Sequence, residues 1–175
     1  GICGSNGGTV ENCFNAATCK VNYSQGQVAG GIAGELLNDG TIKNCYNIGF
    51  IYAPTGPGAI CGENRGSIIN SYYLSGSCAS GEGNMQKASV KKTLAQFASG
   101  EVAWLLNGGT AEGEVTWHQN LGENPDTYPI LDRNHGIVHQ GYDECLLVYG
   151  NSNLPTTPTE HLAFENGFCT NGGSG

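Results

Sequence analysis

The stretch Gly30-Gly-Ile-Ala-Gly-Glu-Leu-Leu-Asn-Asp-Gly-Thr-Ile-Lys-Asn-Cys-Tyr-Asn47 decides the fold, because related copies of it stand at residues 1–15 and 58–73. A sequence that repeats at a fixed period predicts an architecture built from one structural unit per repeat. Five columns of equivalent residues carry the alignment. They are Ile2/Ile32/Ile60, Gly4/Gly34/Gly62, Thr9/Thr41/Ser67, Val10/Ile42/Ile68 and Asn12/Asn44/Asn70.

Each copy contains two short β-branched runs separated by a turn rich in Asn, Asp and Gly, a composition typical of strands joined by tight turns. The copies recur at offsets of 30 and 28 residues, counted between Ile2, Ile32 and Ile60. A period of this length without helical periodicity predicts a mainly β fold, a short right-handed β-solenoid of about three coils. Matching residues of neighbouring coils would then stack about 4.8 Å apart.

The aligned columns predict ladders of side chains along the stack. The columns of Ile32 and Ile42 should point inward, because only apolar side chains can line a narrow core without unpaired polar groups. The column of Asn44 should form an amide ladder at a corner of the coil. The column of Gly34 should mark turns with positive φ.

The pattern Gly-Ile-x-Gly followed by Thr-Ile-x-Asn-Cys-Tyr resembles the GLUG repeat of large bacterial cell-surface proteins, over residues 1 to about 75. The resemblance implies an extracellular protein, secreted or attached to the cell wall, which is often adhesin-like. It carries over no catalytic residue. Because residue 1 already lies inside a repeat, we also expect further repeats of the parent chain upstream.

The composition restricts the partners. The chain of 175 residues has a net charge of -8 with only 7 Lys and Arg, which opposes the phosphate contacts that dominate nucleic-acid affinity. We therefore expect neither nucleic acid nor an anionic membrane as a partner. No run reaches the roughly 18 apolar residues of a membrane helix, so membrane insertion is not expected either. The remaining partners are an extracellular protein or glycan.

Eight cysteines in an extracellular chain would ordinarily predict four disulfides. The repeats argue against that pairing, because Cys13 and Cys45 share a column with Ser71. Stacked neighbours have parallel Cβ vectors about 4.8 Å apart, whereas a disulfide requires about 3.5–4.5 Å. Cys3 and Cys61 share another column and would lie two coils apart. We therefore expect free thiols that act as small core side chains.

Composition divides the chain into three regions. Residues 1–78 hold the GLUG-like repeats, residues 79–150 are expected to cap the array, and residues 151–175 form a Pro- and Thr-containing linker with a degenerate Cys-containing tail. A terminal cap is expected because an open solenoid end is a template for further strand pairing. The order of a helix, a Trp-containing strand and Tyr-Pro-x-Leu is loosely similar to the segment that closes such repeat arrays.

The capping region carries signals for one or two helices and several short strands. Residues 89–98 and 100–107 have helical patterns, with Ser99 as a candidate N-cap and Asn107 as a candidate stop. Short strands are expected at 114–121 and 144–149.

Histidines and cysteines near the C-terminus raise the question of a metal site. His135 and His139 are four residues apart and Cys145 follows, a spacing that would suit zinc on a helix. Gly136 and the β-branched residues after it favour a strand, where the two histidines would lie about 13 Å apart. Two surface or packed histidines are therefore the preferred interpretation, and no metal or cofactor is expected.

The C-terminal tail resembles a short ribbon module of bacterial surface proteins, in which a histidine precedes an aromatic-x-x-Gly-x-Cys-x-x-Cys-Gly segment. Gly172 stands where the second cysteine would be, so His161 and Cys169 are too few for a tetrahedral metal site without further ligands. A disulfide between Cys145 and Cys169 is an open alternative.

No catalytic constellation is present in the sequence. Asp126, Asp132 and Asp143 are scattered acids without the spacing of a carboxylate pair. The candidate ligand-binding residues are aromatic: Trp117, which would be either core or a sugar-stacking platform, and Tyr46 and Tyr73, which we expect on an exposed solenoid surface.

Three functions remain. The first hypothesis is a non-catalytic structural or adhesive module of a bacterial surface protein that binds a host protein or carbohydrate. The second is an accessory domain of a secreted peptidase or glycosidase whose catalytic part lies outside residues 1–175. The third, least favoured, is an enzyme that acts on polysaccharide. A cleft containing the three aspartates and Trp117 would favour the third, and exposed tyrosines along the solenoid would favour the first.

Overall fold

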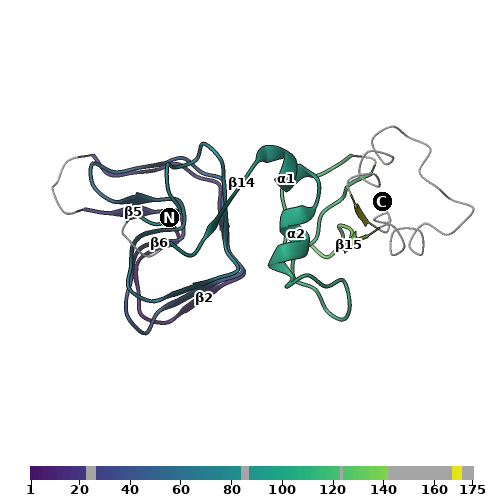
Figure 1. Ribbon diagram of the computed structural model, residues 1–175, viewed down its shortest axis with the longest axis horizontal. Coiled ribbons are helices and arrows are strands. Elements are labelled where there is room, and N and C mark those ends of the chain that lie inside the picture. Colours follow the sequence, from purple (N-terminus) through teal and green to yellow (C-terminus); the bar gives the residue numbers. More distant parts are fainter. Residues whose placement is uncertain (23–26, 84–86, 123, 142–166, 171–175) are drawn as a thin grey trace, which may run out of the picture. The chain divides into compact units, whose positions relative to one another are not determined.

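The computed structural model describes residues 1–22, 27–83, 87–122, 124–141 and 167–170. These residues form a mainly β protein with parallel sheets and a few short helices. The chain divides into two compact units, residues 1–93 and residues 94–175. Figure 1 shows the stacked strands of the first unit and the two helices of the second.

The first unit consists of strands of two to four residues. The first repeat supplies β1 (Cys3–Asn6), β2 (Thr9–Glu11), β3 (Phe14–Asn15) and β4 (Cys19–Lys20). The second supplies β5 (Ala29–Gly30), β6 (Ala33–Leu36), β7 (Thr41–Lys43), β8 (Tyr46–Asn47) and β9 (Ile51–Tyr52). The third supplies β10 (Pro57–Gly58), β11 (Cys61–Asn64), β12 (Ser67–Ile69) and β13 (Tyr72–Leu74), and β14 (Val90–Lys92) follows.

Equivalent strands of the three repeats pair in parallel. Three sheets have the orders β1-β6-β11, β2-β7-β12 and β3-β8-β13-β14, and two further pairs are β4-β9 and β5-β10. The register matches the sequence alignment, since Val10 pairs with Ile42 and Ile42 with Ile68. The predicted stacking of equivalent residues is therefore confirmed.

The predicted core columns are buried in the second and third repeats. Ile32, Ile42 and Ile60 are fully buried, and Ile68 is nearly so. The prediction is wrong for Ile2, which is 44% exposed. Ile2 immediately precedes β1, an edge strand with a neighbour on one side only.

Asparagines occupy the bends between consecutive strands of each repeat. Asn12, Asn44 and Asn70 all adopt positive φ, at 53°, 51° and 46°, a conformation that Asn tolerates better than most residues. The Nδ2 of Asn70 donates to the Oδ1 of Asn44 at 2.8 Å. The predicted corner amide ladder is thus confirmed between these two residues.

A second amide ladder lies inside the stack. The Nδ2 of Asn15 donates to the Oδ1 of Asn47 at 2.7 Å, and the Nδ2 of Asn47 lies 3.4 Å from the Oγ of Ser77. Both asparagines are buried. This ladder satisfies polar groups that would otherwise be costly in the core.

The column of Gly34 and Gly62 holds glycine for a different reason from the one predicted. Gly34 and Gly62 do not have positive φ. A Cβ on Gly34 would lie 2.7 Å from the carbonyl oxygen of Gly4, and one on Gly62 would lie 2.6 Å from that of Gly34. The column is therefore glycine because neighbouring backbones approach closely.

The described cysteines of the first unit are free thiols, which confirms the prediction for the four cysteines of the repeat columns. In one column each side chain donates to the carbonyl oxygen two residues earlier: Cys13 at 3.2 Å, Cys45 at 3.1 Å and Ser71 at 2.9 Å. Serine replaces cysteine in the third repeat because its hydroxyl makes the same hydrogen bond.

The segment before the first helix differs from the prediction. Residues 89–93, expected to be helical, contain the strand β14, which pairs in parallel with β13. The backbone of β14 forms its hydrogen bonds with the open edge of β13. The buried carboxylate of Glu82 accepts the backbone N–H groups of Ala88 and Ser89 at 3.2 and 3.1 Å. Strand pairing therefore overrides the local helical signal.

The second unit begins with α1 (Leu94–Ala98) and α2 (Glu101–Leu106). The N-cap of α2 is Gly100, with φ of 89°, rather than the predicted Ser99, and Asn107 ends the helix as predicted. Neither helix is long and apolar enough to cross a membrane, a finding limited to the described residues.

The strands of the second unit are β15 (Val138–Gln140) and β16 (Phe168–Thr170), which pair antiparallel. The strand predicted at 114–121 is wrong, because the only pairing there is a single bridge between His118 and Ile130. The strand predicted at 144–149 lies outside the described residues. Cys169 is disulfide-bonded, and Cys145, which the sequence analysis left open as its partner, also lies outside them.

Candidate functional site

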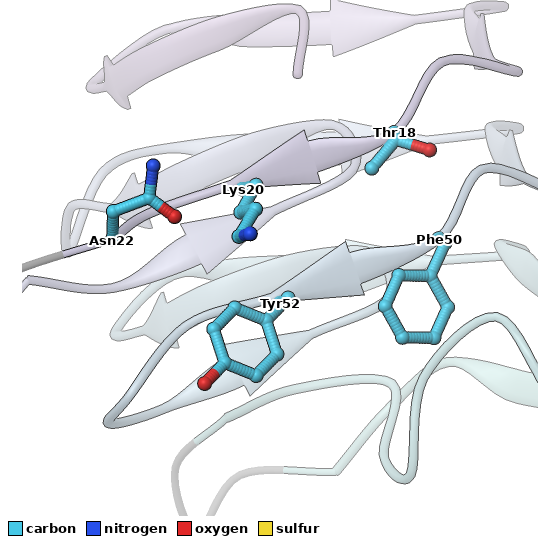
Figure 2. Close-up of a pocket in the computed structure, with 5 residues that line it drawn as sticks. All are labelled: Thr18, Lys20, Asn22, Phe50 and Tyr52. Atoms are coloured by element: carbon cyan, nitrogen blue, oxygen red, sulfur yellow. The ribbon is translucent and has the colours of Figure 1, made fainter.

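A shallow hollow lies over the outward face of β4 and β9. Thr18, Lys20 and Asn22 line it from the first repeat, and Phe50 and Tyr52 line it from the second (Figure 2). Side chains alternate between the two faces of a strand. Cys19 and Ile51 therefore pack into the core, whereas the residues beside them face solvent. The hollow has a volume of about 400 Å³.

The two aromatic rings of the hollow are accessible. Phe50 is 53% exposed and Tyr52 is 47% exposed, and Figure 2 shows both rings with a face open toward the viewer. Lys20 is the register partner of Tyr52, and its Nζ lies 5.8 Å from the centre of the Tyr52 ring. Strand pairing thus positions two aromatic faces and one ammonium group together.

The aromatic residues predicted from sequence to bind a ligand are instead buried. Trp117 is fully buried, Tyr46 is 1% exposed and Tyr73 is 7% exposed. Tyr46 stacks on Phe14 with ring centres 5.2 Å apart, and Tyr73 belongs to the core of the repeats. This burial gives their predicted role no support.

Sequence reasoning missed Phe50 and Tyr52, although the signal was present. They flank Ile51 in the second repeat as Thr18 and Lys20 flank Cys19 in the first. The alternation of an inward apolar residue with outward neighbours could have identified both aromatic residues as exposed.

One predicted acid meets one predicted histidine in the second unit. The Oδ2 of Asp126 lies 2.6 Å from the Nδ1 of His135 and accepts the backbone N–H of Asn120 at 2.7 Å. The Oδ1 of Asn120 accepts the backbone N–H of Gly136 at 2.9 Å. These contacts join two loops, so the pair has a clear structural role.

The other described polar residues that were predicted make separate side-chain contacts. Asp132 accepts hydrogen bonds from the backbone and side chain of Asn134, both at 2.9 Å. His139 lies on β15 in register with Cys169, and Asp143 and His161 lie outside the described residues. No group of three His, Cys, Asp or Glu side chains that could hold a metal ion occurs in the described part of the chain.

A buried glutamine and a half-buried asparagine form a second feature that the sequence did not reveal. The Nε2 of Gln119 donates to the carbonyl oxygens of Phe97 and Asp126, both at 2.9 Å. The side chain of Asn107 donates to the carbonyl oxygen of Trp117 at 2.8 Å and accepts its N–H at 2.9 Å. These contacts fix backbone that lacks regular strand pairing.

The buried thiols are poorly suited to nucleophilic chemistry. Burial raises the pKa of Cys45 and of Cys61 from 9.0 to about 12. The thiolate is the nucleophilic form of cysteine, so neither side chain is reactive near neutral pH.

No protein-family model, curated protein or solved structure matches the chain. The hollow over β4 and β9 and the Asp126–His135 pair are therefore interpreted from their own geometry.

Proposed function

We propose that the chain is a non-catalytic, extracellular repeat module of a bacterial surface protein, with a structural or adhesive role. In this proposal residues 1–93 form a β-solenoid in which each repeat makes one coil. The observation that supports it is the in-register parallel pairing of equivalent strands through all three repeats. Such an array presents a rigid strand surface of regular spacing to a partner.

The side chains around the array favour binding over catalysis. Phe50 and Tyr52 are exposed on the outward face, where burial against a partner would be favourable. The acidic and histidine side chains of the second unit support loops through Asp126 and His135. The alternative is an accessory domain of a secreted peptidase or glycosidase, which would bind its partner through the same outward face. It differs from the first proposal only in that the parent chain would also carry a catalytic domain.

Binding of the intact chain to an array of glycans and extracellular host proteins tests this proposal. We expect saturable binding by the folded chain and none by an Ile32→Asp variant, whose core is disrupted. The same samples are assayed for newly formed reducing ends and amino termini. Product formation that disappears in a His135→Ala variant with an unchanged circular dichroism spectrum would replace the binding function with catalysis.

A further inference from the structure

We propose that the hollow over β4 and β9 binds an acidic glycan, in which sugar rings stack on Phe50 and Tyr52 and a uronic-acid carboxylate pairs with Lys20. This inference rests on the proposed adhesive function and names its ligand class. Five side chains carry it: Thr18, Lys20, Asn22, Phe50 and Tyr52.

The two aromatic residues form a platform of the right kind for sugar. They are two positions apart around Ile51 on β9, so their Cβ atoms are separated by about 6.6 Å along the strand, a distance that neighbouring rings of a glycan can match. Both are about half exposed. A ring held on a paired strand loses little freedom when its face is covered, which favours binding of a flat, partly apolar ligand.

Lys20 supplies the charge that selects an acidic sugar. Two other cations of the unit already have carboxylate partners: Lys43 pairs with Glu11 at 2.9 Å, and Arg65 pairs with Glu63 at 2.7 Å. No carboxylate of the described residues pairs with Lys20, which instead lies over the ring of Tyr52. An arriving carboxylate would therefore find an ammonium group already positioned and without a competing ion pair.

The charge of the whole chain restricts the ligand further. A net charge of -8 repels polyanions of high charge density. One ammonium group in the hollow can compensate isolated carboxylates, but it cannot replace the several cations that phosphate-rich polymers require. A glycan with one carboxylate on a sugar is consistent with both conditions.

Polar side chains complete the hollow at its two ends. Figure 2 shows Asn22 and Thr18 on opposite sides of Lys20, and they lie just beyond the two ends of β4. A hydroxyl and an amide each donate and accept hydrogen bonds, which matches the hydroxyl groups of a sugar. Neither side chain makes the site specific for one sugar, so the inference names the class alone.

The test uses the full chain and hexamers of alternating glucuronic acid and N-acetylglucosamine, in which the carboxylates are separated by neutral sugars, as the free acid and as the fully methyl-esterified form. The ester keeps the sugar rings and removes the charge. By titration calorimetry at about 50 mM salt, we expect the acid to bind at least 5-fold more tightly than the ester. Raising the salt to about 500 mM should weaken binding of the acid, because an exposed ion pair is screened.

Variants assign the binding to the hollow. Phe50→Ala and Tyr52→Ala should each weaken binding of the acid about 10-fold or more, and Lys20→Met should abolish the preference for acid over ester. Ile69→Ala is the matched control, because Ile69 is a large exposed side chain on β12, and it should leave both affinities unchanged. Circular dichroism verifies that each variant is folded.

Three outcomes would overturn the inference. Absence of binding by both hexamers removes the hollow as a glycan site, and equal binding of acid and ester removes the role of Lys20. Binding that is insensitive to both aromatic variants places the sugar elsewhere. If the chain nevertheless binds a glycan or protein on the array, the adhesive function survives while this site assignment fails.

Discussion

The two units of the molecule are held together in different ways. In residues 1–93, equivalent side chains stack on one another, so that Asn44 bonds Asn70 and Asn15 bonds Asn47. In residues 94–175, individual side chains bond the backbone of non-equivalent segments, as Gln119 bonds the carbonyl of Phe97. The first unit is stabilised by repetition of a few contacts, and the second by contacts that occur once.

This difference provides internal controls. A column of the repeats holds similar residues at positions with different environments, because the second repeat has a paired repeat on both sides and the first has one on one side only. A substitution and its control can therefore be identical in chemistry and differ only in environment. The described residues of the second unit form no such columns, so its controls must come from unrelated exposed residues.

The largest effect is expected for an acid in the apolar column. Ile32→Asp places a charge in a fully buried site without a partner and should cost at least about 4 kcal/mol of unfolding free energy. Ile2→Asp makes the same change at the exposed end of the column and should cost less than about 0.5 kcal/mol. Guanidinium unfolding followed by circular dichroism measures both.

Failure of Ile32→Asp to fold would leave only a lower limit, so a milder pair accompanies it. Ile32→Ala should cost about 2–5 kcal/mol because it leaves a cavity, and Ile2→Ala should be nearly neutral. Equal costs at the two positions would contradict the assignment of Ile32 to the core.

The glycine column should give the next largest difference. Gly62→Ala brings a Cβ within 2.6 Å of the carbonyl oxygen of Gly34 and 2.8 Å of the Cβ of Val28, so we expect a loss of about 3 kcal/mol from overpacking. Gly4→Ala meets no atom within 4 Å and should be tolerated. Similar melting temperatures for both variants would mean that close approach is not the reason for the column.

In the second unit, a single side chain should matter comparably. Asn107→Ala removes hydrogen bonds of 2.8 and 2.9 Å to the backbone of Trp117 and should cost about 2 kcal/mol, because it leaves polar groups of the buried segment unpaired. Tryptophan fluorescence during guanidinium unfolding reports this change. Asn134→Ala, at an exposed loop, is the control, and a cost as large as that of Asn107→Ala would show that the contact is not specific.

The smallest effect is expected from pH. The folded state keeps Cys45 and Cys61 protonated, with pKa values near 12 against an ordinary 9.0. Above pH 9 the unfolded state loses these protons before the folded state does, and this favours unfolding. The contribution of these thiols to the free energy of unfolding therefore has its full value below pH 9, and it decreases progressively between pH 9 and 12.

A variant built from the columns isolates that contribution. Cys45→Ser with Cys61→Ala uses the residues found at Ser71 and Ala33 in the same columns. We expect the unfolding free energy of the natural chain to fall more steeply between pH 8 and 10.5 than that of the variant. Parallel curves would mean that other groups, such as tyrosines, cause the whole dependence.

The columns of the first unit could be predicted because each structural position is sampled three times. The reason for a conserved residue type within a column was harder to predict. Glycine serves both positive φ and close backbone approach, and only the structure shows that Gly34 and Gly62 serve the second. The positive φ falls on asparagines such as Asn44.

The remaining failures come from contacts that are distant in sequence. Residues 89–93 have a helical sequence pattern but contain a strand, because β14 pairs with the open edge of β13. The periodicity of a segment does not show which strand edge will be available to it. Tyr73 was expected on the surface, although its alignment with Asn47 places it at an inward position. The pairing of Asp126 with His135 depends on the path of a loop without regular structure, so it could not be predicted from the spacing of the two residues.

The turns of the repeats have a consequence for how such a gene can change. The turn between β6 and β7 contains residues 37–40, whereas the equivalent turns contain residues 7–8 and 65–66, yet the strands on both sides keep one register. Codons can therefore be gained or lost in these turns without altering which residues of neighbouring repeats pair. We therefore expect unequal recombination between copies of different length to keep the strands in register, so that the number of repeats and their length can evolve separately.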